Sequence, residues 1–269
     1  MKTLFSSILA LAMGVTASVA QIPGMMSMPS AQPLEGTSLG ANETIAYDGI
    51  ALGNRVKLRG YVDFIYGYDD NGSNDNSAFS ATADVDFLVD FSPVTGEVHL
   101  NVSDENSLNL EQAFGRYSFN QDFNLSFGRQ LTNLGYEADE APGLYAVTNA
   151  YNYTEASDQN ATLRRNYVDG LRLNFNNGQF GLSLGLHDDY FGVDDAFNDN
   201  IAIDIAASVM IVPGLEARLG FAHQDQEHAN DDNINQFNAW LAYNPGDLTL
   251  ALEFDIFDVY GDELWNLMF

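Results

Sequence analysis

Residues 79–91 read FSATADVDFLVDF, and this stretch decides the fold. Every odd position from Phe79 to Phe91 holds an apolar side chain, whereas the even positions hold Ser, Thr, Asp or Leu. Successive side chains of a β-strand point to opposite faces, so the alternation predicts a strand with one apolar and one polar face. A tilted strand of this length can cross a bilayer.

The same alternation recurs from residue 56 to the C-terminal end. It is clear in 56–68, 179–187, 201–211, 215–221, 236–243 and 248–256, and weaker in 97–103. The segment 108–119 does not keep one parity, which a β-bulge would explain. About twelve such segments are recognisable.

Two kinds of connection alternate between these segments. Tight turns rich in Pro, Gly and Asn fall at 92–96, 120–121, 176–178, 212–214 and 244–247. Longer polar links fall mostly between them, at 69–78, 131–165, 188–200 and 224–233. Short turns at one end and longer loops at the other are typical of outer-membrane barrels. The sequence therefore predicts an all-β fold, a transmembrane antiparallel up-and-down β-barrel, closed because lipid cannot satisfy an open strand edge.

A water-soluble β-sandwich or barrel is the alternative, with the apolar parity as its core. Two observations weigh against it. The apolar parity repeatedly ends in an aromatic residue, as a girdle at the membrane interface would: Tyr66, Tyr68, Phe91, Phe175 and Tyr243. The polar parity carries charges of both signs, which suits a water-filled lumen.

The N-terminal segment has the features of a targeting signal. Lys2 is followed by an apolar run over 4–15 and by small residues ending at Ala20. This pattern predicts a signal peptide over 1–20 that is cleaved on export. Residues 21–54 are rich in Met, Pro, Ser, Gly and Asn and are expected to form a flexible leader, which leaves 55–269 for the barrel.

The charge balance and the missing cysteines exclude several function classes. The chain has 38 Asp and Glu residues against 10 Lys and Arg, a formal net charge of −28. Nucleic-acid binding is not expected, because phosphate recognition needs a basic surface. With no cysteine in the sequence, disulfides, thiolate metal sites and cysteine nucleophiles are excluded.

With these features together, the chain resembles Gram-negative outer-membrane porins, in particular the OmpL-like β-barrel porin family. The stretches that carry the resemblance are LEQAF at 110–114, FGRQ at 127–130, LGYE at 134–137 and RNYVDGL at 165–171. The general barrel resemblance covers nearly all of 56–269, and the family motifs cover about 108–175. The resemblance implies a diffusion pore in the outer membrane, commonly assembled as a homotrimer.

The C-terminal end leaves the strand number open. Trp265, Leu267 and Phe269 alternate toward a terminal Phe, as in the insertion signal of outer-membrane proteins. This last segment is short for a crossing strand, and members of the family tend to be longer. Either the chain forms a compact barrel of about twelve strands, or it is part of a larger barrel.

A porin needs a hydrated hole, a constriction and a pattern of charge, and no nucleophile. The pore-lining candidates are the charged residues on the polar parity of the predicted strands. They are Lys57, Arg59, Asp63, Asp84, Asp86, Asp90, Arg172, Asp204, Glu216, Arg218, Glu253 and Asp255. Because carboxylates outnumber basic groups in this set, we expect a mild preference for cations.

The link over 131–165 is the longest, and it is the third on the long-loop side. In general porins the third external loop folds inward and narrows the pore. The constriction candidates are therefore Glu137, Asp139 and Glu140, facing Lys57, Arg59, Arg172 and Arg218 across a transverse field. A loop that stays outside as a solvated cover is the alternative.

The expected partners are outer-membrane lipid, lipopolysaccharide and small hydrophilic solutes. Acid clusters at 69–75 and 188–199 have the oxygen ligands that Ca²⁺ takes, but solvated loops explain them more simply, and no metal site or cofactor is assigned. Two other functions stay open. One is a non-conducting structural or adhesive barrel with a plugged lumen. The other is an outer-membrane hydrolase, for which His223 and Asp225 are the best pair, although no orienting partner is evident.

Overall fold

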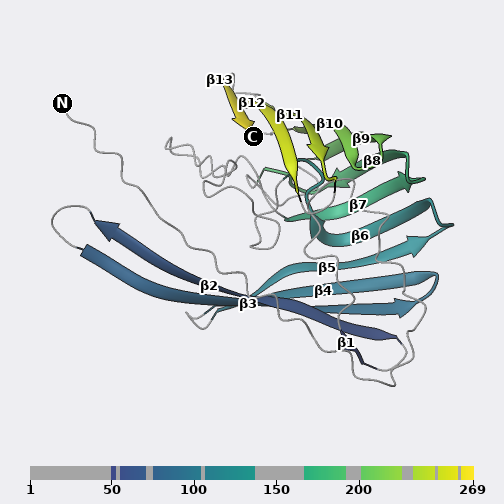
Figure 1. Cartoon of the computed structure of the whole chain (residues 1–269). Helices are drawn as coiled ribbons and strands as arrows, with labels where there is room; N and C mark the ends of the chain where they lie inside the picture. The colour runs from purple at the N-terminus through teal and green to yellow at the C-terminus, as the bar shows by residue number, and fades with distance from the viewer. Residues whose placement is uncertain are drawn as a thin grey trace.

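The computed structural model describes residues 50–52, 55–70, 75–103, 107–136, 167–191, 201–225, 233–245, 248–259 and 262–269. These residues form one antiparallel sheet whose strands are neighbours in chain order (Figure 1). The strands are β1 (Ile50–Ala51), β2 (Val56–Asp70), β3 (Asp75–Phe91), β4 (Val94–Ser103), β5 (Leu108–Ser118), β6 (Phe123–Leu131), β7 (Tyr167–Asn176), β8 (Phe180–His187), β9 (Ala202–Val212), β10 (Leu215–Gln224), β11 (Ile234–Tyr243), β12 (Leu250–Val259) and β13 (Asp262–Met268). No helix in the described part of the chain is long and apolar enough to cross a membrane. The predicted all-β, up-and-down arrangement is confirmed.

The sheet curls strongly, so that β2 and β3 lie on the opposite side of its hollow from β12 and β13 (Figure 1). The connections after β3, β5, β7, β9 and β11 lie at one end, as their register requires. They are short, and asparagine side chains support two of them. Asn120 Oδ1 accepts hydrogen bonds from Asp122 N and Phe123 N, and Asn177 Oδ1 accepts them from Gln179 N and Phe180 N. This is the local bonding that makes Asn a turn residue.

The predicted long link at 69–78 is wrong in length. β2 and β3 stay paired from Val56↔Val89 to Asp70↔Asp75, so only 71–74 lies between them. β4 pairs with β3 only up to Thr82↔Ser103. The hairpin therefore projects beyond its neighbours as a two-stranded ribbon (Figure 1). There the Phe79 ring stacks on Phe64, with ring centroids 5.3 Å apart, and contacts Tyr66 in a tilted arrangement at 4.8 Å.

The mixed parity of 108–119 comes from a β-bulge, as expected. His99 of β4 pairs with Gln112 of β5, but the next pair is Leu100↔Leu110. Glu111 is therefore the extra residue on β5. A bulge of this kind turns two consecutive side chains toward the same face of a sheet.

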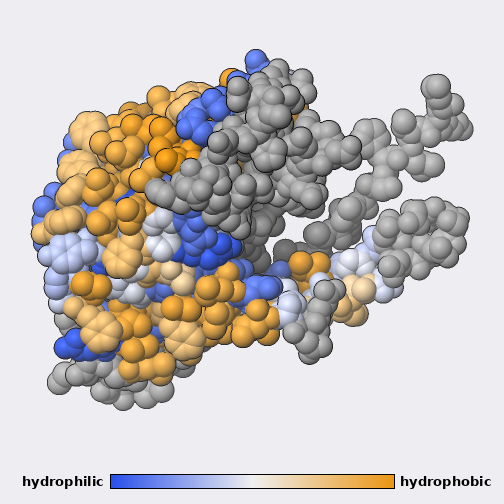
Figure 2. Space-filling model, turned by 180° about the vertical axis from the view of Figure 1, so that it is seen from behind, coloured by the Kyte–Doolittle hydropathy of each residue, from blue (hydrophilic) through white to orange (hydrophobic). Residues whose placement is uncertain are grey.

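The two faces of the sheet have inverted polarity. On β8 the apolar side chains Leu182 and Leu184 are about half exposed, whereas Ser183 between them is buried. β9 repeats this, with Ile203 and Ile205 exposed on either side of buried Asp204. Apolar residues accordingly cover much of the outer surface (Figure 2). The polar side, which we call the inner face, faces the hollow of the curled sheet.

Candidate functional site

All twelve pore-lining candidates lie on the inner face. Directly paired residues of an antiparallel sheet point to the same side, so the register can be followed from strand to strand. Arg59 pairs with Asp86, Asp86 with His99 and His99 with Gln112. Farther along, Arg172 pairs with Gly185 and Gly185 with Asp204. The structure gathers several of them, together with other inner-face residues, into two groups that are bonded in different ways.

The first group, which we call the N-terminal charge cluster, consists of Arg59, Asp86, Glu97, His99 and Arg116. Arg59 Nε lies 2.8 Å from Asp86 Oδ2. The His99 ring sits between two carboxylates, with Nδ1 2.9 Å from Asp86 Oδ1 and Nε2 3.1 Å from Glu97 Oε2. Within this cluster, charges of opposite sign on neighbouring strands thus neutralise one another.

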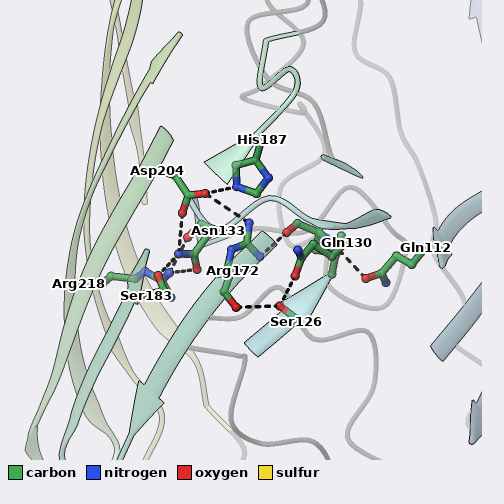
Figure 3. Close-up of polar contacts among 10 residues, drawn as sticks. Gln112, Ser126, Gln130, Asn133, Arg172, Ser183, His187, Asp204 and Arg218 are labelled. Atoms are coloured by element: carbon green, nitrogen blue, oxygen red, sulfur yellow. Dashed lines mark hydrogen bonds and ion pairs between the residues drawn. The ribbon is translucent and has the colours of Figure 1, made fainter. Parts of the chain in front are cut away.

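The second group centres on buried Asp204 (Figure 3). Its carboxylate contacts His187 Nε2 and lies 3.6 Å from Arg172 Nη2. Gly185 lies between Arg172 and Asp204 in the register. A Cβ at Gly185 would overlap Asp204 Oδ2 and His187 Nε2. The glycine therefore lets side chains from β7 and β9 meet across the strand that separates them.

After β6 the chain runs inward as residues 132–136, all buried, which we call the inward segment. Arg218 Nη2 donates to Asn133 O at 2.6 Å and also contacts Asn133 Oδ1. Asn133 Nδ2 donates to Asp204 Oδ1 at 3.1 Å and contacts Ser183 Oγ (Figure 3). Arg172 Nη1 donates to Leu131 O at 2.8 Å, at the end of β6. The charged side chains on the inner face of β7–β10 thus bind the backbone of Leu131 and Asn133 and the side chain of Asn133.

The inward segment then reaches the strands near the C-terminal end. Gly135 N donates to Asn238 Oδ1 at 3.2 Å, and Tyr136 N donates to Glu253 Oε1 at 3.0 Å. Asn238 Nδ2 in turn donates to Glu253 Oε1 and to Asp255 Oδ1, at 2.7 and 2.8 Å. The segment therefore crosses the inner face from β6 to β12.

Residues 188–191, which follow β8, also run inward, and we call them the second inward piece. Tyr190 N and Phe191 N both donate to Gln224 Oε1 at 2.9 Å. Tyr190 and Phe191 are fully buried and join Leu134 in an apolar cluster. The wall of that cluster comes from Val168, Ala202, Ala206, Ala222, Ile234, Phe257 and Val259. Asp189 is also buried, so it does not belong to a solvated acidic loop as expected.

The other candidates are less enclosed. Lys57, Asp63, Asp90 and Glu216 are only partly buried. Asp90 lies beside a turn, where its Oδ1 accepts hydrogen bonds from Ser92 N and Oγ at 2.8 and 2.7 Å. The constriction candidates Glu137, Asp139 and Glu140 lie outside the described residues.

Several inner-face residues were not among the sequence candidates. Gln112 and Arg116 were missed because the bulge on β5 hides the parity of 108–119, and Glu97 and His99 were missed because the alternation at 97–103 is weak. Asn133 was missed because it lies in a predicted link. Glycines at inner-face positions were the available signal. A Cβ at Gly220, for example, would overlap Leu134 Cδ2 of the inward segment.

The proposed hydrolase pair is close in space, but its geometry does not favour a general base. His223 Nε2 lies 3.1 Å from Asp225 Oδ1, and Nδ1 lies 2.7 Å from Asn235 Oδ1. Both ring nitrogens therefore face oxygen acceptors. A general base needs one nitrogen directed at the group that it deprotonates.

No family model and no curated protein matches the chain. Among solved structures, it is similar to a mutant of the Rh. blastica porin, with 12% identity and a TM-score of 0.32 over 79% of this chain and 97% of that one. It is also similar to the anion-selective porin from Comamonas acidovorans, with 14% identity and a TM-score of 0.29 over 76% of this chain and 89% of that one. The OmpL-like assignment stays a prediction.

Proposed function

We propose that the chain is an outer-membrane porin that lets small hydrophilic solutes and ions diffuse passively. The observation that carries the proposal is the inverted polarity of the sheet. Leu184 is half exposed on the outer face, whereas Asp204, Glu253 and Arg218 are buried on the inner face. A protein folded for water has the opposite arrangement.

The outer face supports a lipid environment. Large apolar side chains are exposed on every strand from β2 to β13, and they cover much of the outer surface (Figure 2). Soluble monomers rarely expose apolar patches larger than a few hundred Å². Lipid removes that cost, and backbone hydrogen bonds join each strand from β2 to β12 to both of its neighbours, as lipid demands of polar groups.

The inner face supports a hydrated path with an off-centre constriction. The inward segment occupies the hollow in front of β8–β12, so we propose that solutes pass along β2–β5. The remainder of the 131–165 link, with Glu137, Asp139 and Glu140, would narrow that path. Carboxylates outnumber basic groups among the inner-face candidates, which favours cations in a narrow lumen.

The same proposal includes export and assembly. Cleavage of residues 1–20 would release the mature chain, which would contact lipid and lipopolysaccharide in the outer membrane and assemble as a homotrimer. Fractionation of cells and cross-linking of the intact protein test these two parts separately from conduction.

Single-channel conductance of the refolded mature chain in a planar bilayer, with a salt gradient, tests the function. We expect stable conductance steps and a reversal potential that favours cations. An anion-favouring potential would refute the cation preference. Inserted, heat-modifiable protein without steps would refute the pore.

A non-conducting structural barrel is the second candidate, and one observation favours it. Leu134, Tyr190 and Phe191 pack as an apolar cluster inside β7–β13, as a plug would. The conductance experiment separates the two functions, because a plug that fills the remaining hollow abolishes steps without preventing insertion.

A further inference from the structure

The β-bulge on β5 adds a carboxylate to the inner face. Gln112 lies opposite His99, and the extra residue Glu111 precedes it. In a regular strand, Glu111 would face outward, away from the polar side. The bulge instead allows Glu111 and Gln112 to share the inner side. Bulges are common where a protein must redirect one side chain.

The redirected carboxylate meets a buried one on β3. Asp84 is only 2% exposed, and it interacts with the carboxylates of Glu111 and Asp86. Neither oxygen of Asp84 accepts a hydrogen bond from any residue that the structure describes. A buried carboxylate without a donor is costly, so the arrangement calls for a positive charge or a proton.

The nearby cationic groups are engaged with other acids. Arg59 and His99 contact Asp86 at 2.8 and 2.9 Å. Arg129 Nη1 lies 2.9 Å from Asp169 Oδ2, while its Nε donates to the backbone oxygen of Glu111. Across the described ranges, Asp84 forms no ion pair. The remaining neighbours in its register row are Tyr61 on β2 and Asn101 on β4.

We propose that Asp84 and Glu111 bind a hard cation of the Ca²⁺ class on the inner face. Carboxylate oxygens are the ligands that such ions take. No group of three His, Asp or Glu side chains among the described residues has the arrangement of a metal cage. Water therefore completes the coordination shell, and the ion exchanges readily. If the chain conducts, permeating cations bind transiently at this site. Only this role in permeation rests on the porin proposal.

Tb³⁺ luminescence of the folded full chain in detergent tests the site. Tb³⁺ takes the same oxygen ligands as Ca²⁺, and Tyr61, the cross-strand partner of Asp84, can sensitise its emission. We expect a luminescent component that Ca²⁺ displaces. Asp84→Asn and Glu111→Gln should each weaken its apparent affinity about tenfold, since ligand charge sets affinity at such sites. Asp258→Asn, which removes an exposed carboxylate of the outer face, is the matched control and should leave this component unchanged.

Two outcomes would overturn the inference. One is unchanged Tb³⁺ affinity in both inner-face variants, each shown to be folded by heat-modifiable mobility. The other is an infrared band of a protonated carboxyl that disappears in Asp84→Asn, because a proton would then neutralise the pair. Conductance is measured in parallel. If the inner-face variants lose Tb³⁺ binding but keep their conductance steps, the site is confirmed. If the wild-type chain binds Tb³⁺ but shows no conductance steps, only the porin proposal is refuted.

Discussion

The inner face carries charge along its whole width, but its two halves use that charge differently. Across β2–β5, acids and bases on adjacent strands contact one another, as Arg59 and Asp86 do. Across β7–β12, they bind the inward segment, as Arg218 does with Asn133. The same alternating pattern thus produces a wall of ion pairs between adjacent strands in one half and an anchoring surface in the other. The difference teaches that parity selects a face but does not determine what covers it.

Side-chain volume explains why the inward segment lies over one half. The inner face of β8–β10 includes Gly181, Gly185 and Gly220, which leave space above the sheet. Leu134 fills the space above Gly220. The corresponding face of β3–β5 carries Asp86, Glu97 and Gln112, and their side chains fill that volume themselves.

Replacing Arg218 should have the largest effect on this comparison. Arg218→Gln removes two charge-assisted contacts to Asn133, one at 2.6 Å, from a fully buried position. Each such bond contributes about 1.5–3 kcal/mol, so we expect the free energy of unfolding to fall by roughly 3 kcal/mol. Urea unfolding in micelles measures this. If the pore proposal holds, release of the inward segment also widens the hollow and raises single-channel conductance.

Arg59→Gln is the control in the other half. It breaks the ion pairs of Arg59 with Asp86 and Glu97 and leaves every contact of the inward segment in place, so it should not reproduce the rise in conductance expected of Arg218→Gln. Equal conductance changes in the two variants would show that the halves do not differ in this way.

Gly220→Ala should have the next largest effect. The added Cβ would overlap Leu134 Cδ2, so either the inward segment or β10 must shift. Overpacking of this kind costs about 1–3 kcal/mol. Gly67→Ala is the matched control, because a Cβ there meets nothing within 4 Å. Equal unfolding free energies for the two variants would contradict close packing of Leu134 on β10.

The sequence predicts the sheet and the shared face far better than the contacts on it. Alternation needs only a period of two, so residues as distant as Lys57 and Asp255 are assigned to one side correctly. Which charges meet depends on register, and the bulge at Glu111 changes that register between β4 and β5. Asn133 could not be assigned to a face, because a connecting segment lacks the alternating pattern of a strand. The glycines on the inner face of β8–β10 leave room above the sheet, and this room indicates where the link folds inward.

Gln112 offers a way to sharpen the comparison, because it belongs to the wall and also contacts the end of β6. Its Oε1 accepts a hydrogen bond from Leu131 N at 3.2 Å, while Nε2 lies 3.1 Å from His99 Nδ1. Gln112→Met keeps the length and removes both bonds. We expect a loss of about 1 kcal/mol in unfolding free energy. Gln179→Met, at an exposed turn, is the control and should not change the unfolding free energy measurably. If Gln179→Met lowers it as much as Gln112→Met does, the two hydrogen bonds of Gln112 do not stabilise the fold.

The smallest effect concerns pH at the start of the second inward piece. Burial raises the pKa of Asp188, and the nearby negative charge of Asp169 raises that pKa further. A carboxyl whose pKa is higher in the folded than in the unfolded protein opposes folding once it is ionised. Its penalty is absent below the unfolded pKa, grows as pH rises from the unfolded to the folded pKa, and is complete above the folded pKa. Asp188→Asn should therefore raise the melting temperature slightly at neutral pH and leave it unchanged in acid, where both forms are neutral. A variant that is equally stabilised at both pH values would show that charge is not the cause, and that Asp188 constrains residues 188–191 through its shape alone.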